Sequence, residues 1–244
     1  MKRHIPNLFT LMNLFSGCVG VLFVVYGNFV AGAFCVFLGI FFDFFDGFIA
    51  RKLEVSSELG LQLDSLADMV TSGLVPGLVM FKLLTMSLDA EQSTEWNTLI
   101  DFNGVAFQPL ALVGLLVTLG SAYRLAKFNI DTEQQTAFKG LPTPANALLV
   151  LSLPLILEFQ STAWLTQLIL NPWFLVVFSV FSCYILNSSV RLFALKAKDW
   201  SFQANKVRYS FLLISLVLLL LLQFMAIPIV IALYIILSVF TKNA

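Results

Sequence analysis

The sequence predicts an all-α fold: a polytopic membrane bundle of about eight transmembrane helices with both termini in the cytoplasm. Three observations support this prediction. Of the 244 residues, 59% are hydrophobic and only 11% are charged, whereas about a quarter of the residues in soluble domains are charged. The apolar residues gather in runs long enough to cross a bilayer. Basic residues lie in alternate connections between these runs.

Each apolar run is expected to form one helix, because a crossing of the bilayer takes about 20 residues. The runs are continuous rather than alternating, which argues against membrane-spanning strands. The last two are separated only around Gln223, and about 34 residues exceed one crossing, so a helical hairpin is expected there. The expected spans cover residues 12–27, 29–49, 61–86, 104–124, 142–160, 171–190, 208–222 and 225–241.

The basic residues test this order of spans. With the N-terminus inside, 13 of the 14 Lys and Arg residues fall on one face, and only Lys82 lies near the other. The connection at 87–103 carries acidic residues and no Lys or Arg. This distribution follows the positive-inside rule and places both termini in the cytoplasm. The basic residues of the inner face are Lys2, Arg3, Arg51, Lys52, Arg124, Lys127, Lys139, Arg191, Lys196, Lys198, Lys206, Arg208 and Lys242.

Composition excludes several other classes of protein. A net charge of zero does not suit a nucleic-acid-binding protein, so no nucleic-acid partner is expected. The low charge and the many aromatic residues are the opposite of a disordered chain. Cys18, Cys35 and Cys183 lie inside apolar runs, where thiols are expected rather than bridges or metal ligands. Membrane lipids are therefore the first expected partners.

Four carboxylates lie where a membrane helix rarely carries any. Asp43 and Asp46 come at the inner end of the second span, and Asp64 and Asp68 at the start of the third. Ionisable residues at such depth cost free energy and mark functional sites. The members of each pair are three or four residues apart, so each pair lies on one helix face. Because the connection between the spans is short, the two faces are expected to meet.

Such a cluster predicts a metal site. Four negative charges at close range repel by several kcal/mol unless cations or protons neutralise them. Oxygen ligands without His or Cys favour hard cations such as Mg²⁺ or Mn²⁺. Two ions would balance four carboxylates and suit a displacement at phosphorus. Helix-end solvation and the helix dipole explain one or two such residues, but not four on two facing stripes.

The residues between the carboxylates have small or phosphate-binding side chains. Gly47 and Gly60 each disfavour a helix by about 1 kcal/mol relative to alanine, and beside a metal site they leave room for a ligand. Ala50 leaves similar room, and Arg51 offers a forked donor that suits phosphate.

Together these residues form the string Asp43-x2-Asp46-Gly47-x2-Ala50-Arg51-x8-Gly60-x3-Asp64-x3-Asp68. The string resembles the full signature of the CDP-alcohol phosphotransferases. The resemblance implies transfer from a CDP-linked donor to an alcohol, with release of CMP. By carry-over, the four aspartates hold two divalent cations, and Asp68 is also the general base. Gly47, Ala50 and Gly60 line the cytidine pocket, and Arg51 holds a phosphate.

Three further stretches resemble the branch of this family that uses L-serine: IPNLFTLMN, RLAKFN and FKGLPTPA. The resemblance implies CDP-diacylglycerol as donor and phosphatidylserine and CMP as products. Arg124 and Lys139 are candidates to pair with the serine carboxylate, and Asn13 and Asn129 to hydrogen-bond the acceptor. Positive-inside orientation explains the two cations equally well, and capping or interhelical bonding explains Asn13.

These expectations combine into one domain over residues 1–244, with a six-helix catalytic core at about 1–190 and two extra spans at about 208–241. The active site faces the cytoplasm from the inner membrane, and the resemblance also implies a homodimer. Glycerol 3-phosphate or inositol phosphate is the alternative acceptor, although each would require added basic residues in the pocket. A cation transporter is the alternative class, but the sequence has no visible internal repeat.

Overall fold

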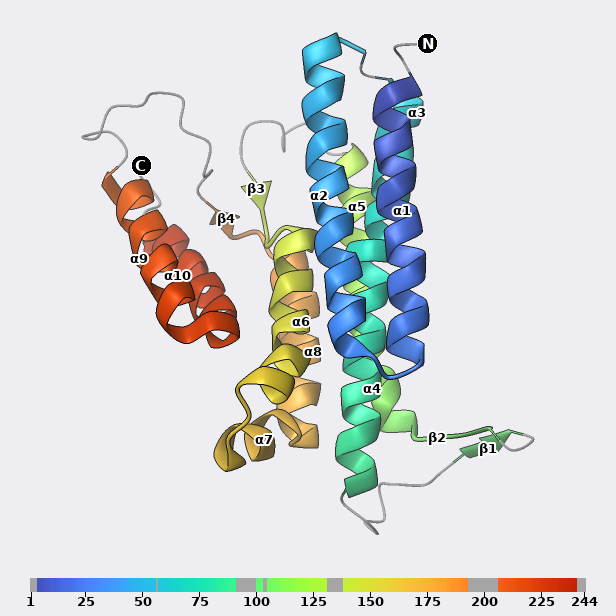
Figure 1. Cartoon of the computed structure of the whole chain (residues 1–244), viewed down its shortest axis with the longest axis vertical. Helices are drawn as coiled ribbons and strands as arrows, with labels where there is room; N and C mark the ends of the chain where they lie inside the picture. The colour runs from blue at the N-terminus through green and yellow to red at the C-terminus, as the bar shows by residue number, and fades with distance from the viewer. Residues whose placement is uncertain are drawn as a thin grey trace.

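The computed structural model describes residues 4–55, 57–90, 100–102, 105–130, 138–192 and 206–240. Helices make up most of these residues (Figure 1). The helical elements are α1 (His4–Val25), α2 (Phe29–Leu53), α3 (Glu58–Asp68), the π-helix η1 (Met69–Leu74), α4 (Val75–Ala90), the 3₁₀-helix η2 (Pro109–Leu115), α5 (Leu116–Ile130), α6 (Thr143–Phe159), α7 (Ala163–Ile169), α8 (Pro172–Asn187), α9 (Lys206–Leu222), the 3₁₀ turn η4 (Gln223–Met225) and α10 (Ala226–Phe240).

Four short strands lie in the described parts of the connections between helices. β1 (Ile100–Phe102) pairs antiparallel with β2 (Val105–Phe107). β3 (Phe138–Lys139) pairs antiparallel with β4 (Arg191–Leu192). None of the described strands approaches the length of a membrane-spanning strand, so the prediction of helical spans is confirmed.

Helices occupy all eight predicted runs, but they differ in length. Among the described residues, five helical segments are long and apolar enough to cross a membrane, and a sixth arises if α7 and α8, bent by 58°, form one broken span. The 17-residue α6 is shorter than these. The structure thus confirms a helical, membrane-type fold, while the number of crossings and the orientation of the termini stay predictions.

The last apolar segment folds back on itself as predicted. Gln223 has a φ of 49°, and the ring centroids of Phe211 and Tyr234 lie 5.6 Å apart. In one continuous helix these rings would be about 34 Å apart. Gln160 at the end of α6 holds the reversal: its Nε2 donates to the Leu222 carbonyl at 3.0 Å, and its Oε1 accepts from the Met225 N–H at 3.1 Å.

The N-terminal half of the bundle is built around α1, which packs against both α2 and α3 (Figure 1). Close approach depends on small residues, because a Cβ on Gly17 would meet Thr71 Oγ1 at 2.4 Å and a Cβ on Gly39 would meet Thr71 Cγ2 at 2.5 Å. Thr71 belongs to η1, so the π-helical turn carries this side chain between α1 and α2. This packing places one end of each of the helices α1, α2 and α3 close together.

Candidate active site

The reversal between α2 and α3 places the signature residues at one end of the bundle. Glu54 ends α2 with a φ of 54°, and its N–H bonds the carbonyls of Ala50 and Arg51. Ser57 then caps α3, accepting from the Gly60 N–H at 3.0 Å. As a result α3 runs antiparallel to α2, with its first turns level with the last turns of α2 (Figure 1).

Three of the four predicted carboxylates come together. Asp43, Asp64 and Asp68 each offer an oxygen, and these oxygens all lie within 4.8 Å of one another. Asp68 is buried, whereas Asp43 and Asp64 are partly buried. The two predicted faces therefore do meet, at the end of the bundle that holds the α2–α3 turn.

Asp46 lies outside this group of three. Its Oδ2 accepts a hydrogen bond of 2.5 Å from the Thr10 hydroxyl on α1. Arg51, one turn further along α2, is close enough to interact with it electrostatically. Asp46 is buried, and its hydrogen bond to Thr10 connects it to α1.

Asp68 is also held from α1. Asn13 Nδ2 donates to Asp68 Oδ1 at 3.1 Å, and both side chains are buried. Oδ2 of Asp68 makes no hydrogen bond within the described part of the chain.

The small residues of the signature lie at the same end of the bundle. The atoms nearest to a Cβ on Gly47 would be those of the Arg51 guanidinium, with Nη1 at 3.5 Å, so Arg51 lies over this glycine. A Cβ on Gly60 would lie 3.1 Å from Ser57 Oγ and 3.4 Å from Asn7 Oδ1. Ala50 and Gly60 are partly exposed, and Arg51 is exposed. A phosphate at this surface would find a guanidinium beside an uncovered stretch of helix.

The cluster has the donor set of a divalent-cation site. Buried polar atoms normally have partners, yet Asp64 Oδ1 is buried with no hydrogen-bond partner. Converging carboxylate oxygens suit Mg²⁺ or Mn²⁺, and like charges this close need a neutralising cation. The residues therefore fit a divalent ion held by Asp43, Asp64 and Asp68.

Arg124 on α5 has a defined set of backbone partners. Its Nη1 donates to the carbonyl of Lys139 at 2.7 Å and to that of Leu186 at 2.8 Å. The same junction joins Gly140 N–H to the Val190 carbonyl at 2.9 Å. Arg124 thus ties the β3 segment to the end of α8, and Lys139 is placed beside it.

Substitution of Gly140 tests how much this junction contributes to the free energy of unfolding. It has a φ of +73°, and a Cβ there would meet the Leu186 carbonyl oxygen at 2.4 Å. Gly27 has a similar φ of +80° with nothing within 4 Å. We expect Gly27→Ala to cost about 1 kcal/mol from backbone strain alone, and Gly140→Ala about 3 kcal/mol. Thermal unfolding in detergent measures both, and equal melting temperatures would contradict the expected clash.

Asn129, the other predicted acceptor residue on α5, faces α3. Its Nδ2 donates to Ser65 Oγ at 3.0 Å and to Gln62 Oε1 at 3.4 Å. Ser65 lies between Asp64 and Asp68 in the chain, so Asn129 borders the turn that carries two of the carboxylates. The structure does not place Asn129 or Lys139 in direct contact with any of the four aspartates.

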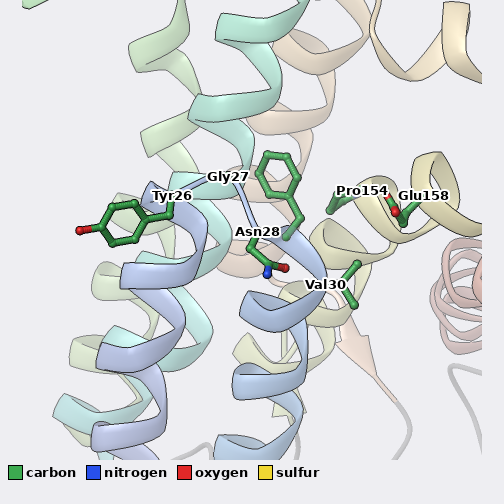
Figure 2. Close-up of a pocket in the computed structure, with 7 residues that line it drawn as sticks. Tyr26, Gly27, Asn28, Val30, Pro154 and Glu158 are labelled. Carbon is green, nitrogen blue, oxygen red and sulfur yellow. The ribbon is translucent and has the colours of Figure 1, made fainter.

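A cavity of about 300 Å³ lies at the other end of α1 and α2 (Figure 2). Pro154 and Glu158 of α6 line it together with residues 26–30 at the α1–α2 turn. Fifteen residues of helix separate Asn28 from Asp43, which corresponds to about 22 Å. The cavity is therefore separate from the carboxylate cluster.

The contacts made by α1 were not predicted from the sequence. Asn13 was predicted as an acceptor residue, and Thr10 only as part of a stretch with a family resemblance. In the structure both side chains donate hydrogen bonds to carboxylates of the signature. The sequence feature that could have indicated these contacts is a polar residue at every third position of an apolar helix, because this spacing places the residues roughly on one face.

Comparison with known proteins agrees with the geometry. The profile of the CDP-alcohol phosphatidyltransferase family matches residues 3–170. The chain is 32% identical over 142 residues to the CDP-diacylglycerol–serine O-phosphatidyltransferase of Bacillus subtilis (strain 168), covering 58% of this chain and 70% of that protein. It is 33% identical over 147 residues to the protein of the same name from Helicobacter pylori (strain J99), covering 59% of this chain and 54% of that protein.

An archaeal relative has a related name. The archaetidylserine synthase of Methanothermobacter thermautotrophicus is 28% identical over 151 residues, which cover 61% of this chain and 56% of that protein. The chain thus spans little more than half the length of two of these three relatives. The family match includes every signature residue and more than half of the chain, and the chain belongs to the CDP-alcohol phosphatidyltransferase family.

Proposed function

We propose that this protein transfers the phosphatidyl group of CDP-diacylglycerol to the hydroxyl of L-serine, giving phosphatidylserine and CMP. The observation that carries the proposal is the convergence of Asp43, Asp64 and Asp68 inside the family signature. The names of the relatives from Bacillus and Helicobacter support serine as the acceptor.

In the proposed reaction Asp68 is the general base. The serine hydroxyl is a weak nucleophile, so a positioned carboxylate must take its proton. The serine oxygen attacks the phosphorus that bears diacylglycerol, the bond from that phosphorus to the bridging pyrophosphate oxygen breaks, and CMP leaves with that oxygen. The proton moves to Asp68, whose Oδ2 makes no hydrogen bond within the described residues.

The metal ligands are proposed to be the four aspartates, with Asp43, Asp64 and Asp68 as the group that the geometry supports most directly. We propose two Mg²⁺ or Mn²⁺ ions, with Asp46 as the fourth ligand. Bound divalent ions would neutralise negative charge on the transferred phosphoryl group and on the leaving CMP.

The donor and acceptor are proposed to bind on opposite sides of the carboxylates. Gly47, Ala50 and Gly60 leave the uncovered surface for the nucleotide, and Arg51 lies over Gly47 where it can bind a phosphate. For the acceptor we propose Arg124, Asn129 and Lys139. Asn13, the fourth candidate from the sequence, is buried and donates to Asp68 instead. Arg124 uses Nη1 for two backbone carbonyls, and its other N–H groups have no partner among the described residues.

The site is proposed to face the cytoplasm from the inner membrane. The carboxylate end of the bundle is also the end at which the described chain begins and finishes (Figure 1), and the positive-inside pattern assigns this end to the cytoplasm. Eight crossings, with α6, α9 and α10 each counted as one, agree with this arrangement. The homodimer implied by the resemblance belongs to the same proposal.

The acceptor is tested by offering serine, glycerol 3-phosphate and inositol phosphate separately to the purified full-length protein with CDP-diacylglycerol and Mn²⁺. We expect a lipid product only with serine, identified as phosphatidylserine by mass spectrometry. A product with a phosphorylated acceptor would keep the family chemistry and overturn the choice of serine. Repeating the serine assay in sealed inverted and right-side-out vesicles tests the membrane face, because serine added outside reaches a cytoplasmic site only in the inverted ones.

No product with any acceptor, from folded protein, would instead favour the transporter. A cation transporter would move ions across the membrane and leave the lipid donor intact.

A further inference from the structure

The first helix carries three buried polar residues three positions apart in an otherwise apolar segment. Thr10, Asn13 and Ser16 are 3%, 0% and 5% exposed. A spacing of three places them roughly on one helix face, directed into the bundle. Burying a polar group in a membrane helix costs free energy unless the group has a hydrogen-bond partner. The partner of each of these three residues, which we call the polar stripe of α1, therefore indicates its role.

Two of the three residues have a carboxylate of the signature as a partner, and the Thr10 hydroxyl also lies 3.2 Å from the Pro6 carbonyl of its own helix. The Thr10 hydroxyl donates to Asp46 Oδ2 at 2.5 Å, and Asn13 Nδ2 donates to Asp68 Oδ1 at 3.1 Å. Ser16 instead donates to the backbone carbonyl of Cys35 at 2.7 Å. The stripe therefore divides into two residues that hold carboxylates and one that joins two helices.

Asn13 is closely packed, and its Oδ1 is buried without a hydrogen-bond partner among the described residues. The Thr71 hydroxyl donates to the backbone carbonyl of Asn13 at 3.1 Å, which fixes the helix turn on which Asn13 lies. A Cβ on Gly39 would lie 2.7 Å from Asn13 Oδ1, so the amide oxygen is packed against α2. With Oδ1 directed at Gly39, the Nδ2 group is the one that faces Asp68.

We propose that Asn13 and Thr10 are positioning residues for the carboxylates of the active site, with Asn13 orienting Asp68 and Thr10 orienting Asp46. The inference rests on the proposed function, because it assigns Asp68 the role of base. An N–H donor on Oδ1 fixes the rotation of the Asp68 carboxylate and leaves Oδ2 for the reacting proton. Groups that orient metal ligands typically change metal affinity or activity by about 10–100-fold when they are removed.

This role differs from direct contact with the acceptor. If Asn13 bound serine, its loss would raise the KM for serine. If Asn13 orients Asp68, its loss lowers kcat and leaves both KM values nearly unchanged, because substrate binding is retained while the base is misplaced.

The test compares Asn13→Leu and Thr10→Val, which keep the side-chain volume without the donor, in the full-length protein. We expect Asn13→Leu to lower kcat about 10–100-fold with less than a threefold change in either KM. Thr10→Val should weaken Mn²⁺ binding about tenfold, measured by electron paramagnetic resonance without turnover. Thr10→Ser, which keeps the hydroxyl, should recover most of that affinity.

Ser16→Ala is the matched control, since it removes a buried hydrogen bond from the same stripe without touching a carboxylate. It should lower the melting temperature and leave kcat and Mn²⁺ affinity close to wild type.

Three results would overturn the inference. The first is an unchanged kcat in Asn13→Leu, the second a rise in the KM for serine alone, and the third a loss of activity that Ser16→Ala shares in proportion to its melting temperature. If wild-type protein releases no CMP, the proposed function fails instead, while Mn²⁺ binding to Thr10→Val still tests the positioning role.

Discussion

Asp68→Asn should abolish CMP release while the protein keeps its fold. Asparagine has the shape of aspartate, and its Oδ1 can still accept the hydrogen bond from Asn13 that the structure shows at 3.1 Å. It cannot take the proton of the acceptor hydroxyl. General bases contribute about 10²–10⁴-fold to rate, and loss of a negative ligand also weakens the metal site. We therefore expect a loss of at least about 10³-fold, measured as CMP release by purified protein.

The control for this substitution is Glu158→Gln. Glu158 is an exposed carboxylate that lines the cavity at the other end of the bundle, so the same chemical change should leave activity within about twofold. Both variants are compared by their melting temperatures in detergent. Near-normal turnover in folded Asp68→Asn would show that Asp68 is not the base.

Asp43→Ala should weaken metal dependence and donor binding together. Asp43 supplies one of the three oxygens that lie within 4.8 Å of one another, so Asp43→Ala removes one ligand of the proposed metal site. Removal of a direct ligand is expected to raise the Mn²⁺ concentration for half-maximal activity by about 100-fold or more. The KM for CDP-diacylglycerol should rise with it, since the pyrophosphate would be bound through the same ions.

Asp89→Ala provides the comparison for Asp43→Ala. Asp89 lies at the far end of α4 and accepts a hydrogen bond of 2.7 Å from Gln108, so its loss should leave the Mn²⁺ titration unchanged. An identical titration for Asp43→Ala and wild type would remove Asp43 from the metal site. A change in metal dependence without any change in the KM for the donor would separate the metal from the pyrophosphate.

Much of the carboxylate cluster was predictable because it depends on helix periodicity. Residues three or four apart share a helix face whatever the tertiary packing, and the short connection after α2 forces α3 to run back beside it. Periodicity does not determine rotamers or the nearest neighbour of each side chain. For this reason the hydrogen bond of Asp46 with Thr10 was not predicted.

The contribution of α1 was harder to predict for a related reason. Asn13 in an apolar helix is equally compatible with capping, interhelical bonding and acceptor binding, and only the packing of α1 against α3 selects Asp68 as its partner. Arg124 presents the same difficulty. Its position at the inner end of a span is already explained by the positive-inside rule. The sequence therefore contains no separate indication that its guanidinium donates to two backbone carbonyls.

The terminal hairpin shows where composition is informative and where it is not. A length well beyond one crossing predicted a reversal near Gln223, and the contact of Phe211 with Tyr234 confirms it. The attachment of that reversal to α6 depends on the side chain of Gln160. A single polar residue near a helix end carries no pattern from which such a partner could be predicted.

The most direct test of the central claim is CMP release by the purified protein from CDP-diacylglycerol and serine, with and without a chelator. A metal-dependent phosphatidyl transfer through the aspartate cluster predicts CMP release with Mn²⁺ or Mg²⁺, none after chelation, and recovery when the metal is restored. CMP release that persists fully after chelation would contradict the metal-dependent mechanism. No release under any of these conditions, from protein with a normal melting transition, would contradict phosphatidyl transfer itself.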